Sequence, residues 1–549
     1  MNTDQRAPLQ SNMRFMNFYD RETYRRWYSE GFWTSDTLLD AIARHAAVHP
    51  KRDALVEGSK RLDYSQLLKG IDAVAVRLHE AGVGAGDVVA VQLPNSLHLA
   101  VTILALLRIG AVYLALNPSY DEYDLRRIFR VGRPKLHIFP RQFNKKDYPA
   151  LAHRVAEQSG GGVFPIAVDL DDEEWLGVHG ATRGGPVPGF AAPDPDALFL
   201  LGSTSGSTGE PKLYSHIQNT QFNEARTLNR LLDVGEKDAF LVCFPMTHRG
   251  ALMFGLLQSL AAGSKLVILR EYDPYAIVRA AAAEHVTALF LIPMQAFAVL
   301  AAANELGLRC ESVRLMMLSG APVPPELVRQ IRTQWPNCSP ITGYGASEDG
   351  FSTITRLDDP PEQLTTCGRP IPGQEVCIDT EGRNADGVGE ILIRGAFLFG
   401  GYYADQHQTN AAFKGTWFRT GDLGRQDADG TLHLTGRLKN VIIRGGLNIH
   451  AEEVENILLQ HEAVAEVLAI GLPDDRLGER LAVCVVPRQG ASFDAGVMLE
   501  HLTQVGITKF KIPEFFALMD ALPRNAVGKQ DRIALRKRCS EIAFSRVAS

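Results

Sequence analysis

Short apolar runs that alternate with amphipathic helical segments constrain the fold of this chain more than any other feature. Each run is long enough for one buried strand and too short for a helix, and helical periodicity fills the segments between the runs. Strands that alternate with helices in this way predict α/β layers with parallel strands. The runs lie at 88–93, 135–139, 163–168, 197–201, 240–244, 265–269 and 288–292.

The most apolar stretch covers residues 99–116 and contains a charged residue, Arg108. A membrane-spanning helix needs about 20 nearly uncharged residues. Because Asn117-Pro118 also ends the run, we expect a buried helix over 97–109 followed by a strand, and no contact with a membrane.

Capping and turn residues mark a further helix and two loops. A helix is expected over 37–49 with Asp36 as its N-cap. Gly, Pro and Asp gather at 158–163 and at 181–196, which we expect to be surface loops.

Beyond about residue 370 the pattern changes to short strands separated by Gly/Asp turns. Strands are expected at 390–393 and 431–434, with Asp427–Gly430 as a hairpin connection. The segment that follows predicts a small α+β unit. It consists of a helix over 451–460 and strands at 464–470 and 481–486.

The length of 549 residues corresponds to roughly three to four domain-sized units. We place a boundary near 437–440, which divides the chain into an N-terminal domain, 1–437, and a C-terminal domain, 438–549. The expected fold class is α/β. The large N-terminal domain would contain layered, mostly parallel sheets with helices and a small barrel-like β region, and the C-terminal domain would be a small α+β unit.

Composition excludes several classes of protein. Lys plus Arg is 57 and Asp plus Glu is 63, so the net charge is −6, which argues against a nucleic-acid-binding protein. The seven cysteines contain no CxxC pair, so neither a disulfide framework nor a structural zinc site is expected. The N-terminal segment MNTDQRAPLQSN has no apolar core and is not a secretory signal. We therefore expect a cytoplasmic protein.

A Ser/Thr/Gly-rich loop that ends in lysine follows the apolar run at 197–201. Residues 203–214 read STSGSTGEPKLY. Glycines let backbone N–H groups approach an anion, hydroxyls donate to phosphate oxygens, and lysine adds positive charge. The spacing matches neither GxxxxGK[ST] nor GxGxxG, so a phosphate-binding loop and a flexible Ser/Gly turn both stay open. The candidate phosphate ligands are Thr204, Ser205, Gly206, Ser207, Thr208, Gly209 and Lys212.

The residue order of the loop resembles the signature of the acyl-adenylate-forming superfamily. This superfamily contains acyl-CoA synthetases, the adenylation domains of peptide synthetases, and luciferases. Six further motifs resemble that family in the same order, and the chain is most similar to its acyl-CoA synthetase and aryl-acid AMP ligase branch. The resemblance implies a large N-terminal domain and a mobile C-terminal domain. The six motifs are Leu107–Tyr113 with Asn117-Pro118, Ser319–Pro322, Tyr344–Glu348, Trp417–Asp422, Gly436–Asn440 with Arg444–Ile449, and Pro523–Lys529.

The resemblance implies a reaction in two halves. A carboxylate attacks the α-phosphorus of ATP to give acyl-AMP and pyrophosphate, and a thiol then takes the acyl group and releases AMP. The first half brings two anions together, so catalysis needs positive charge and oriented donors. By resemblance Lys529 supplies this charge, Glu348 holds Mg²⁺ and Asp422 accepts hydrogen bonds from the ribose hydroxyls.

The resemblance also implies further contacts to the nucleotide and the thiol. It implies a hinge at Lys439, about which the small domain would rotate between the two half-reactions. Two positions depart from the family pattern, because Ser347 replaces Thr and Asn440 replaces Asp. The implied nucleotide-binding residues are Gly320, Ala321, Pro322, Gly343, Tyr344, Gly345, Ser347 and Arg437, and the implied thiol path follows Gly445, Gly446 and Leu447.

The acid would bind beside His248, the implied catalytic gate. In the aryl-acid branch the next residue is an asparagine that contacts an ortho hydroxyl, but here it is Arg249, which offers no acceptor. Arg249 could pair with a second anionic or carbonyl group of the acid, turn toward phosphate, or lie along the pocket rim. The implied acid-binding residues are His248, Arg249, Gly250, Met294, Ser319 and Gly343.

Apolar candidates for the pocket wall favour an aromatic, alicyclic or polycyclic acid over acetate. The thiol is either coenzyme A or the pantetheine arm of a separate carrier protein, and we rank a CoA ligase first. A homologue that runs only one half-reaction is a third possibility. The expected cofactors are ATP, Mg²⁺ and coenzyme A. The wall candidates are Met246, Ala251, Leu252, Met253, Phe254 and Met294.

Overall fold

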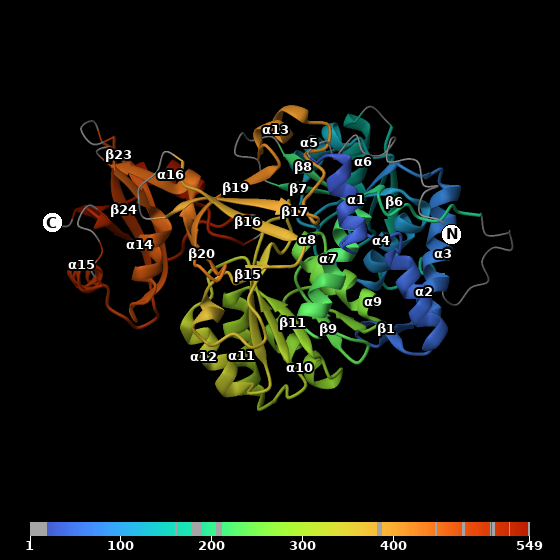
Figure 1. Ribbon diagram of the computed structural model, residues 1–549, viewed down its shortest axis with the longest axis horizontal. Helices are drawn as coiled ribbons and strands as arrows, with labels where there is room; N and C mark the ends of the chain where they lie inside the picture. Colours follow the sequence, from blue (N-terminus) through green and yellow to red (C-terminus); the bar gives the residue numbers. More distant parts are fainter. Residues whose placement is uncertain are drawn as a thin grey trace. The chain divides into compact units, whose positions relative to one another are not determined.

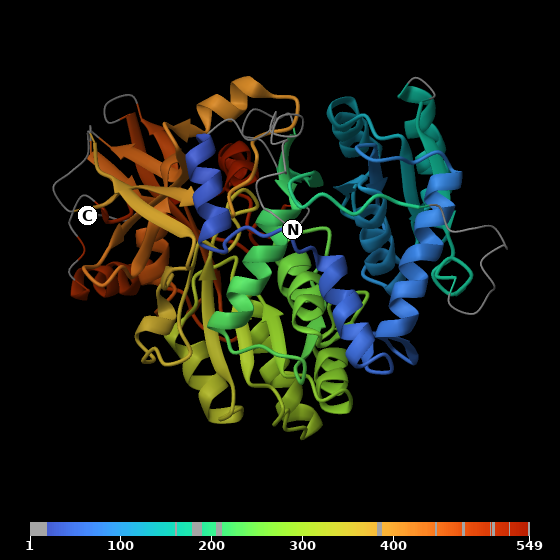
Figure 2. The same ribbon diagram turned by 45° about the vertical axis from the view of Figure 1, so that its right-hand side comes forward.

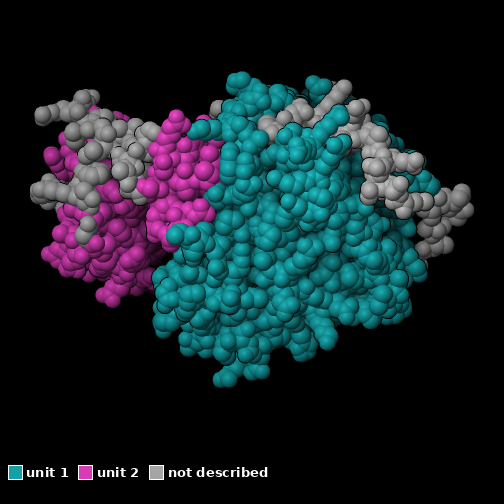
Figure 3. Space-filling model, in the orientation of Figure 1, with its two compact units in different colours: residues 1–376, 393–418, 428–431 teal, residues 377–392, 419–427, 432–549 magenta. Residues whose placement is uncertain are grey.

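The computed structural model describes residues 19–159, 162–177, 189–204, 211–381, 387–444, 447–474, 478–505, 507, 511–525 and 528–546. The chain forms two compact units, which Figure 3 colours separately. The first contains residues 1–376, 393–418 and 428–431, and the second contains 377–392, 419–427 and 432–549. The second unit thus includes two segments, 377–392 and 419–427, that precede the predicted domain boundary at 437–438. That boundary stays a prediction.

A nine-stranded sheet forms one layer of the first unit. Its six central strands are parallel, and its outer pairs β1–β2, β13–β14 and β14–β15 are antiparallel. The predicted strands at 240–244, 265–269 and 288–292 are confirmed as β9, β10 and β11. In spatial order the strands are β15 (Arg369–Pro370), β14 (Thr353–Ile354), β13 (Ser339–Tyr344), β12 (Leu315–Leu318), β11 (Ala288–Leu291), β9 (Ala239–Val242), β10 (Lys265–Ile268), β1 (Asp53–Glu57) and β2 (Lys60–Asp63).

Helices cover this sheet and bury its apolar strands. Leu289 and Met316 of the strands belong to one buried cluster with Ile277, Leu300 and Ile331 of three crossover helices. Helix α7 packs against α9 and the π-helix η3, in the middle of the first unit (Figures 1 and 2). The crossover helices are α10 (Pro274–Ala283), α11 (Pro293–Leu306) and α12 (Pro325–Gln334), and the other elements are α7 (Gln218–Leu231), α8 (Arg249–Ala251), η3 (Leu252–Leu257) and α9 (Gln258–Ala262).

A six-stranded sheet forms the second layer. Its strands are parallel except for the antiparallel pair β7–β8. The helix predicted over 97–109 is confirmed as α4, and the strands predicted at 88–93, 135–139, 163–168 and 197–201 are confirmed within about three residues at their ends. The strands are β6 (Phe164–Val168), β5 (Leu136–Pro140), β3 (Val88–Val91), β4 (Val112–Ala115), β7 (Leu198–Thr204) and β8 (Lys212–Ile217), and the helices are α3 (Tyr64–Glu80), α4 (Leu97–Ile109), α5 (Glu122–Gly132) and α6 (Tyr148–Gln158).

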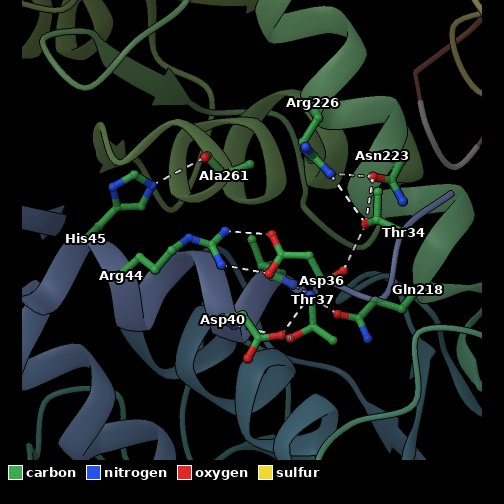
Figure 4. A network of polar contacts seen from close by, with 11 residues as sticks. Thr34, Asp36, Thr37, Asp40, Arg44, His45, Gln218, Asn223, Arg226 and Ala261 are labelled. Carbon is green, nitrogen blue, oxygen red and sulfur yellow. Dashed lines mark hydrogen bonds and ion pairs between the residues drawn. The ribbon is translucent and has the colours of Figure 1, made fainter. Parts of the chain in front are cut away.

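The N-terminal helices α1 (Arg21–Ser29) and α2 (Leu38–Val48) precede both layers. The prediction that Asp36 caps α2 is wrong. Thr37 is the N-cap, because its hydroxyl accepts the Asp40 N–H at 3.2 Å while the Asp40 carboxylate accepts the Thr37 N–H at 2.9 Å (Figure 4). Asp36 instead pairs with both guanidinium ends of Arg44, at 2.6 and 2.7 Å.

The second unit contains a six-stranded sheet that matches the predicted α+β unit. Val454 and Leu502 of two helices pack with Val483 on one face, and Leu535 of a third helix belongs to a separate cluster. The sheet contains β22 (Leu447–His450), β21 (Val441–Arg444), β24 (Gly478–Pro487), β25 (Phe515–Leu518), β26 (Ser545–Arg546) and β23 (Val464–Asp474), and the helices are α14 (Ala451–Leu458), α15 (Ala495–Gln504) and α16 (Arg532–Lys537).

A five-stranded sheet corresponds to the small β region expected beyond residue 370. The hairpin connection predicted at 427–430 joins the antiparallel strands β19 and β20. Among the described helices, none is both long and apolar enough to cross a membrane. The strands are β16 (Gln374–Asp379), β17 (Gly389–Gly395), β19 (Trp417–Gln426), β18 (Phe413–Lys414) and β20 (Leu432–Arg437), and α13 (Gln406–Ala411) lies between β17 and β18 in the chain.

Candidate active site

The fold gathers candidate residues from four distant segments at one edge of the nine-stranded sheet. Strands β13, β12, β11 and β9 are parallel neighbours, so their carboxyl ends lie at the same edge. His248 follows β9, Met294 follows β11, Ser319 follows β12, and Tyr344 ends β13. Ligands of α/β sheets bind outside this edge. The same connections carry Arg249, Gly250, Gly320, Ala321, Pro322, Gly343, Gly345, Ser347 and Glu348.

His248 lies at the turn between β9 and α8. Its Nε2 is 3.3 Å from Nδ2 of Asn117, and its ring centroid is 5.2 Å from that of Phe244. Asn117 belongs to the predicted motif that ends in Asn117-Pro118. The amide and the ring together hold the imidazole at the carboxyl edge, where a gate beside the acid is expected.

Phenylalanine rings dominate the region next to this histidine. The Phe290 ring lies 6.4 Å from Phe244, 5.6 Å from Phe254 and 6.3 Å from Phe351, measured between ring centroids. A Cβ at Gly250 would lie 3.3 Å from Cζ of Phe290, and a Cβ at Gly343 would lie 2.7 Å from Cδ1 of Phe351. The phenylalanine rings therefore pack directly against these two glycines, and a larger residue at either position would push a ring aside.

The other wall candidates divide into buried and exposed residues. Met294, in the first turn of α11, is 55% exposed. The remaining five are fully or almost fully buried, and four of them lie in or next to the π-helix η3, a rare helix type often found at functional sites. The five are Met246, Ala251, Leu252, Met253 and Phe254.

The predicted phosphate loop lies between two antiparallel strands. Thr204 of β7 pairs with Lys212 of β8, and Tyr120 Oη is 3.1 Å from Ser203 Oγ. A buried strand therefore leads into the loop as predicted. The candidate ligands Ser205, Gly206, Ser207, Thr208 and Gly209 lie outside the described residues.

Tyr402 connects Lys212 to Glu348 and was not predicted as a site residue. Lys212 Nζ lies over the Tyr402 ring, 4.9 Å from its centroid, and Tyr402 Oη donates to Glu348 Oε1 at 3.0 Å. Burial, followed by the charge of Glu348, raises the pKa of Tyr402, so the hydroxyl stays a donor. No local pattern marks this tyrosine, because its partners are distant in the chain.

Glu348 and Asp349 are both buried in the turn that follows β13. Burial raises the pKa of Glu348, opposed by the Tyr402 hydrogen bond. Burial also raises the pKa of Asp349 to about 7, although Ser352 Oγ donates to its carboxylate at 2.6 Å. A bound Mg²⁺ would favour the charged form of Glu348, and one carboxylate suits a cation that keeps water and phosphate oxygens as its other ligands. Among the described residues, no group of three or more His, Cys, Asp or Glu side chains is arranged to hold a metal.

Arg249 does not lie along a pocket rim. Its side chain is 2% exposed, and its Nη2 pairs with the fully buried carboxylate of Glu224 in α7. The guanidinium is thus committed to a protein carboxylate, which argues against the predicted contact with the acid. Glu224 was not among the predicted site residues, since a glutamate within a helix is usually exposed.

Three candidate residues lie together in the second unit. Asp422 of β19 pairs with Arg437 of β20 in register, and Asp422 Oδ1 lies 2.8 Å from Arg437 Nε. Lys529 is exposed, in a turn where Gly528 has φ of 78°. Desolvation by surrounding protein atoms lowers the pKa of Lys529, the charge of Arg437 lowers it further, and Asp422 opposes the shift.

The predicted hinge and thiol path are described only in part. Lys439 lies in the short 3₁₀ helix Leu438–Asn440, and Leu447 begins β22. Gly445 and Gly446 lie outside the described residues. Arg444, the first residue of the predicted motif Arg444–Ile449, pairs with Glu514 at 2.8 Å.

These features define a class: a two-unit α/β protein in which the motifs that resemble the acyl-adenylate-forming superfamily lie at the carboxyl edge of a parallel sheet and, with Lys529, near the C-terminus. Comparison with known proteins agrees. The family model described as AMP-binding enzyme matches residues 42–403, and that of the AMP-binding enzyme C-terminal domain matches residues 453–529.

Curated relatives match over nearly the whole chain. A 2-hydroxy-7-methoxy-5-methyl-1-naphthoate–CoA ligase from Streptomyces carzinostaticus is 33% identical, over 93% of this chain and 94% of the relative. A 2,3-dihydroxybenzoate–AMP ligase from Bacillus subtilis is 31% identical, over 95% and 96%. Among solved structures, o-succinylbenzoate CoA synthetase from Bacillus subtilis in complex with its acyl-adenylate intermediate has a TM-score of 0.78 at 26% identity, over 92% and 98%.

The chain therefore belongs to the AMP-binding enzyme family, in the acyl-CoA synthetase and aryl-acid ligase branch of the acyl-adenylate-forming superfamily. It is an ATP-dependent, AMP-forming acid–thiol ligase.

Proposed function

We propose that this enzyme activates an aromatic carboxylic acid as its acyl-AMP and transfers the acyl group to coenzyme A. The observation that carries the proposal is the group of phenylalanine rings around Phe290, next to His248 and beside Gly250 and Gly343. Aromatic rings pack favourably against one another edge to face or offset. Both relatives named above carry an aromatic acid in their names, which supports the same class of substrate.

In this proposal each charged residue acts on one part of the first half-reaction. Lys529 stabilises the negative charge that develops between the carboxylate and the α-phosphate, and Glu348 holds Mg²⁺. Asp422 accepts hydrogen bonds from the ribose, so its ion pair with Arg437 must open or share its oxygens. His248 closes the acid pocket, and Lys212 contacts phosphate oxygens.

The second half-reaction would follow a rotation of the C-terminal domain, 438–549, about Lys439. Coenzyme A is our first choice of thiol, supported by the CoA ligase among the relatives. The alternative is loading of a separate carrier protein, supported by the relative named as an AMP ligase. Since the reaction uses ATP, the proposal keeps the cytoplasm as its location.

The test is a mass-spectrometric assay with ATP, Mg²⁺, CoA and a pooled library of benzoic, naphthoic, alicyclic and fatty acids. AMP, acyl-AMP and acyl-CoA are followed separately. We expect one or a few aromatic acyl-CoA products in step with AMP. Acyl-AMP without acyl-CoA would favour the carrier-protein alternative, or a homologue that runs only the first half-reaction. Preferred use of fatty acids would contradict the aromatic pocket.

A further inference from the structure

A cluster of buried polar side chains lies directly beneath the loop that carries Glu348. It consists of His216 from β8, Gln221 and Glu224 from α7, and Arg249 from α8, and we call it the buried clamp. Glu224 pairs with Arg249 Nη2. The Gln221 amide oxygen, oriented toward the guanidinium, accepts from Arg249 Nη2 at 2.8 Å and from Arg249 Nε at 3.1 Å.

The buried clamp holds both ends of the loop 347–351. At one end, His216 Nε2 is 2.8 Å from the Ser347 carbonyl oxygen. Because burial keeps the pKa of His216 well below its usual range, the ring is neutral and Nε2–H is the donor. At the other end, Glu224 Oε1 accepts the Phe351 N–H at 2.8 Å. Glu348 is thus fixed between two backbone groups that the clamp binds.

Gly350 shows how closely the loop and the clamp approach each other. Its φ of 70° is a conformation that other residues adopt at a cost. A Cβ at this position would overlap Arg249 Nη1 and both carboxylate oxygens of Glu224. The guanidinium and the carboxylate therefore fill the space under the loop and leave none for a bound acid.

We propose that Arg249 and Glu224 are positioning residues, which hold the 347–351 loop so that Glu348 meets Mg²⁺ and Phe351 faces the acid pocket. Arg249 pairs with the Glu224 carboxylate and orients it, and Glu224 holds the Phe351 N–H. Because the charge of Arg249 is neutralised inside the protein, it does not select acids with a second anionic group. The proposal rests on the proposed function, in which Glu348 binds the metal.

The experiment compares variants that remove both charges, because a single Arg249 substitution would leave Glu224 buried and unpaired. Glu224→Met/Arg249→Met removes the ion pair and the acceptor of the Phe351 N–H. Glu224→Gln/Arg249→Met removes the same charges but keeps an acceptor oxygen at position 224. ATP–pyrophosphate exchange is measured against Mg²⁺ concentration with the best acid of the wild-type enzyme, and the acid ranking is measured in parallel.

We expect the first double variant to raise the Mg²⁺ concentration for half-maximal exchange at least about fivefold. We expect it to lower kcat by about 10- to 100-fold, since a misplacement of about 1 Å has an effect of this size. The ranking of acids should not change. The Glu224→Gln/Arg249→Met variant should keep most of the wild-type kcat and should need a Mg²⁺ concentration closer to that of the wild type.

The matched control is Asp238→Leu/Arg314→Met, which removes an ion pair of 2.8 Å before β9 and β12, at the opposite edge of the same sheet. Whatever its effect on stability, the Mg²⁺ dependence of this control should equal that of the wild type. A changed acid ranking with unchanged Mg²⁺ dependence in the Arg249 variants would overturn the proposal and make Arg249 a substrate-contacting residue. Equal behaviour of the clamp variants and the control would also overturn it.

Failure of the proposed function gives a different result. In that case the wild-type enzyme itself shows no Mg²⁺-dependent exchange with any acid. The clamp is then tested by thermal unfolding with ATP, with and without Mg²⁺. A Mg²⁺-dependent rise in Tm that the wild type and the control show but Glu224→Met/Arg249→Met loses would support the positioning role, and a rise kept by all three would contradict it.

Discussion

The two loops that carry the charged groups of the proposed first half-reaction are built in opposite ways. Glu348 is buried in a loop whose ends are held by His216 and Glu224. Lys529 is exposed in a turn held by its own neighbours, in which the Lys529 N–H donates to Asn525 Oδ1 at 3.0 Å. The first loop is preorganised by the core of its unit, whereas the second presents a long side chain from the surface. This difference suits a metal site that must stay in place and a lysine that must act in only one half-reaction.

The largest effect is expected from Gly350→Ala, which would disturb the fixed loop that carries Glu348. The added Cβ combines an unfavourable φ with overlap against Arg249 and Glu224, and we expect a loss of about 3 kcal/mol in the free energy of unfolding. Gly307→Ala is the matched control, because Gly307 has φ of 62° and open space around its Cβ position, and it should cost about 1 kcal/mol. Denaturant unfolding measures both values. Equal losses would show that the space under the loop is not tightly filled.

A smaller effect is expected when the contact between Tyr402 and Glu348 is removed. Tyr402→Phe deletes a hydrogen bond to a carboxylate, worth about 1 to 2 kcal/mol, and should lower kcat of ATP–pyrophosphate exchange roughly 5- to 30-fold with little change in the KM of the acid. The control is Tyr275→Phe, which deletes a similar bond to Glu305 on the surface and should leave the kinetics unchanged. A change in the KM of the acid alone would instead place Tyr402 at the acid pocket.

The smallest effect concerns the response of the first unit to acid. Burial lowers the pKa of His137 to about 3, whereas the unfolded chain titrates it near 6.5. Between these two pKa values the unfolded state binds more protons than the folded state. The contribution of the neutral ring to the free energy of unfolding is therefore complete above about pH 6.5 and is lost as the pH falls toward 3.

At pH 5.5 this loss should be about 1.4 kcal/mol. Between pH 7.5 and 5.5 the free energy of unfolding should therefore change less for His137→Gln than for the wild type. His153→Gln, at an exposed position, should keep the wild-type slope. Identical slopes for the wild type and His137→Gln would show that His137 is not buried in its neutral form.

Local signals in the sequence predicted much of the fold. Helix α4 was predicted over its full observed range from its apolar run. The structure shows that the Ser96 side chain caps its first turn and that Gly110 ends it with φ of 79°. The N-cap of α2 was assigned one residue too early, since Asp36 and Thr37 are both good caps and only the contact with Asp40 distinguishes them. Strand β8 was missed, because its pairing with β7 depends on the tertiary fold.

Motif order in the sequence indicated which segments carry the candidate site, but the contacts that depend on burial were not predictable. His248 and Ser319 follow β9 and β12, and Tyr344 ends β13, so these predicted candidates lie at one edge of the sheet. The engagement of Arg249 with Glu224 could not be predicted, because their 25-residue separation carries no helical or strand periodicity. The same holds for Tyr402, which is 54 residues from Glu348.

The most direct test of the account is to measure the two half-reactions of Lys529→Ala separately. The first is ATP-dependent acyl-AMP formation, and the second is thioester formation from synthetic acyl-AMP and CoA. If Lys529 serves adenylation alone, the first should fall by about 100-fold or more, while the second stays within about threefold of the wild type. Equal loss of both steps would contradict the division of labour between a fixed metal loop and an exposed lysine.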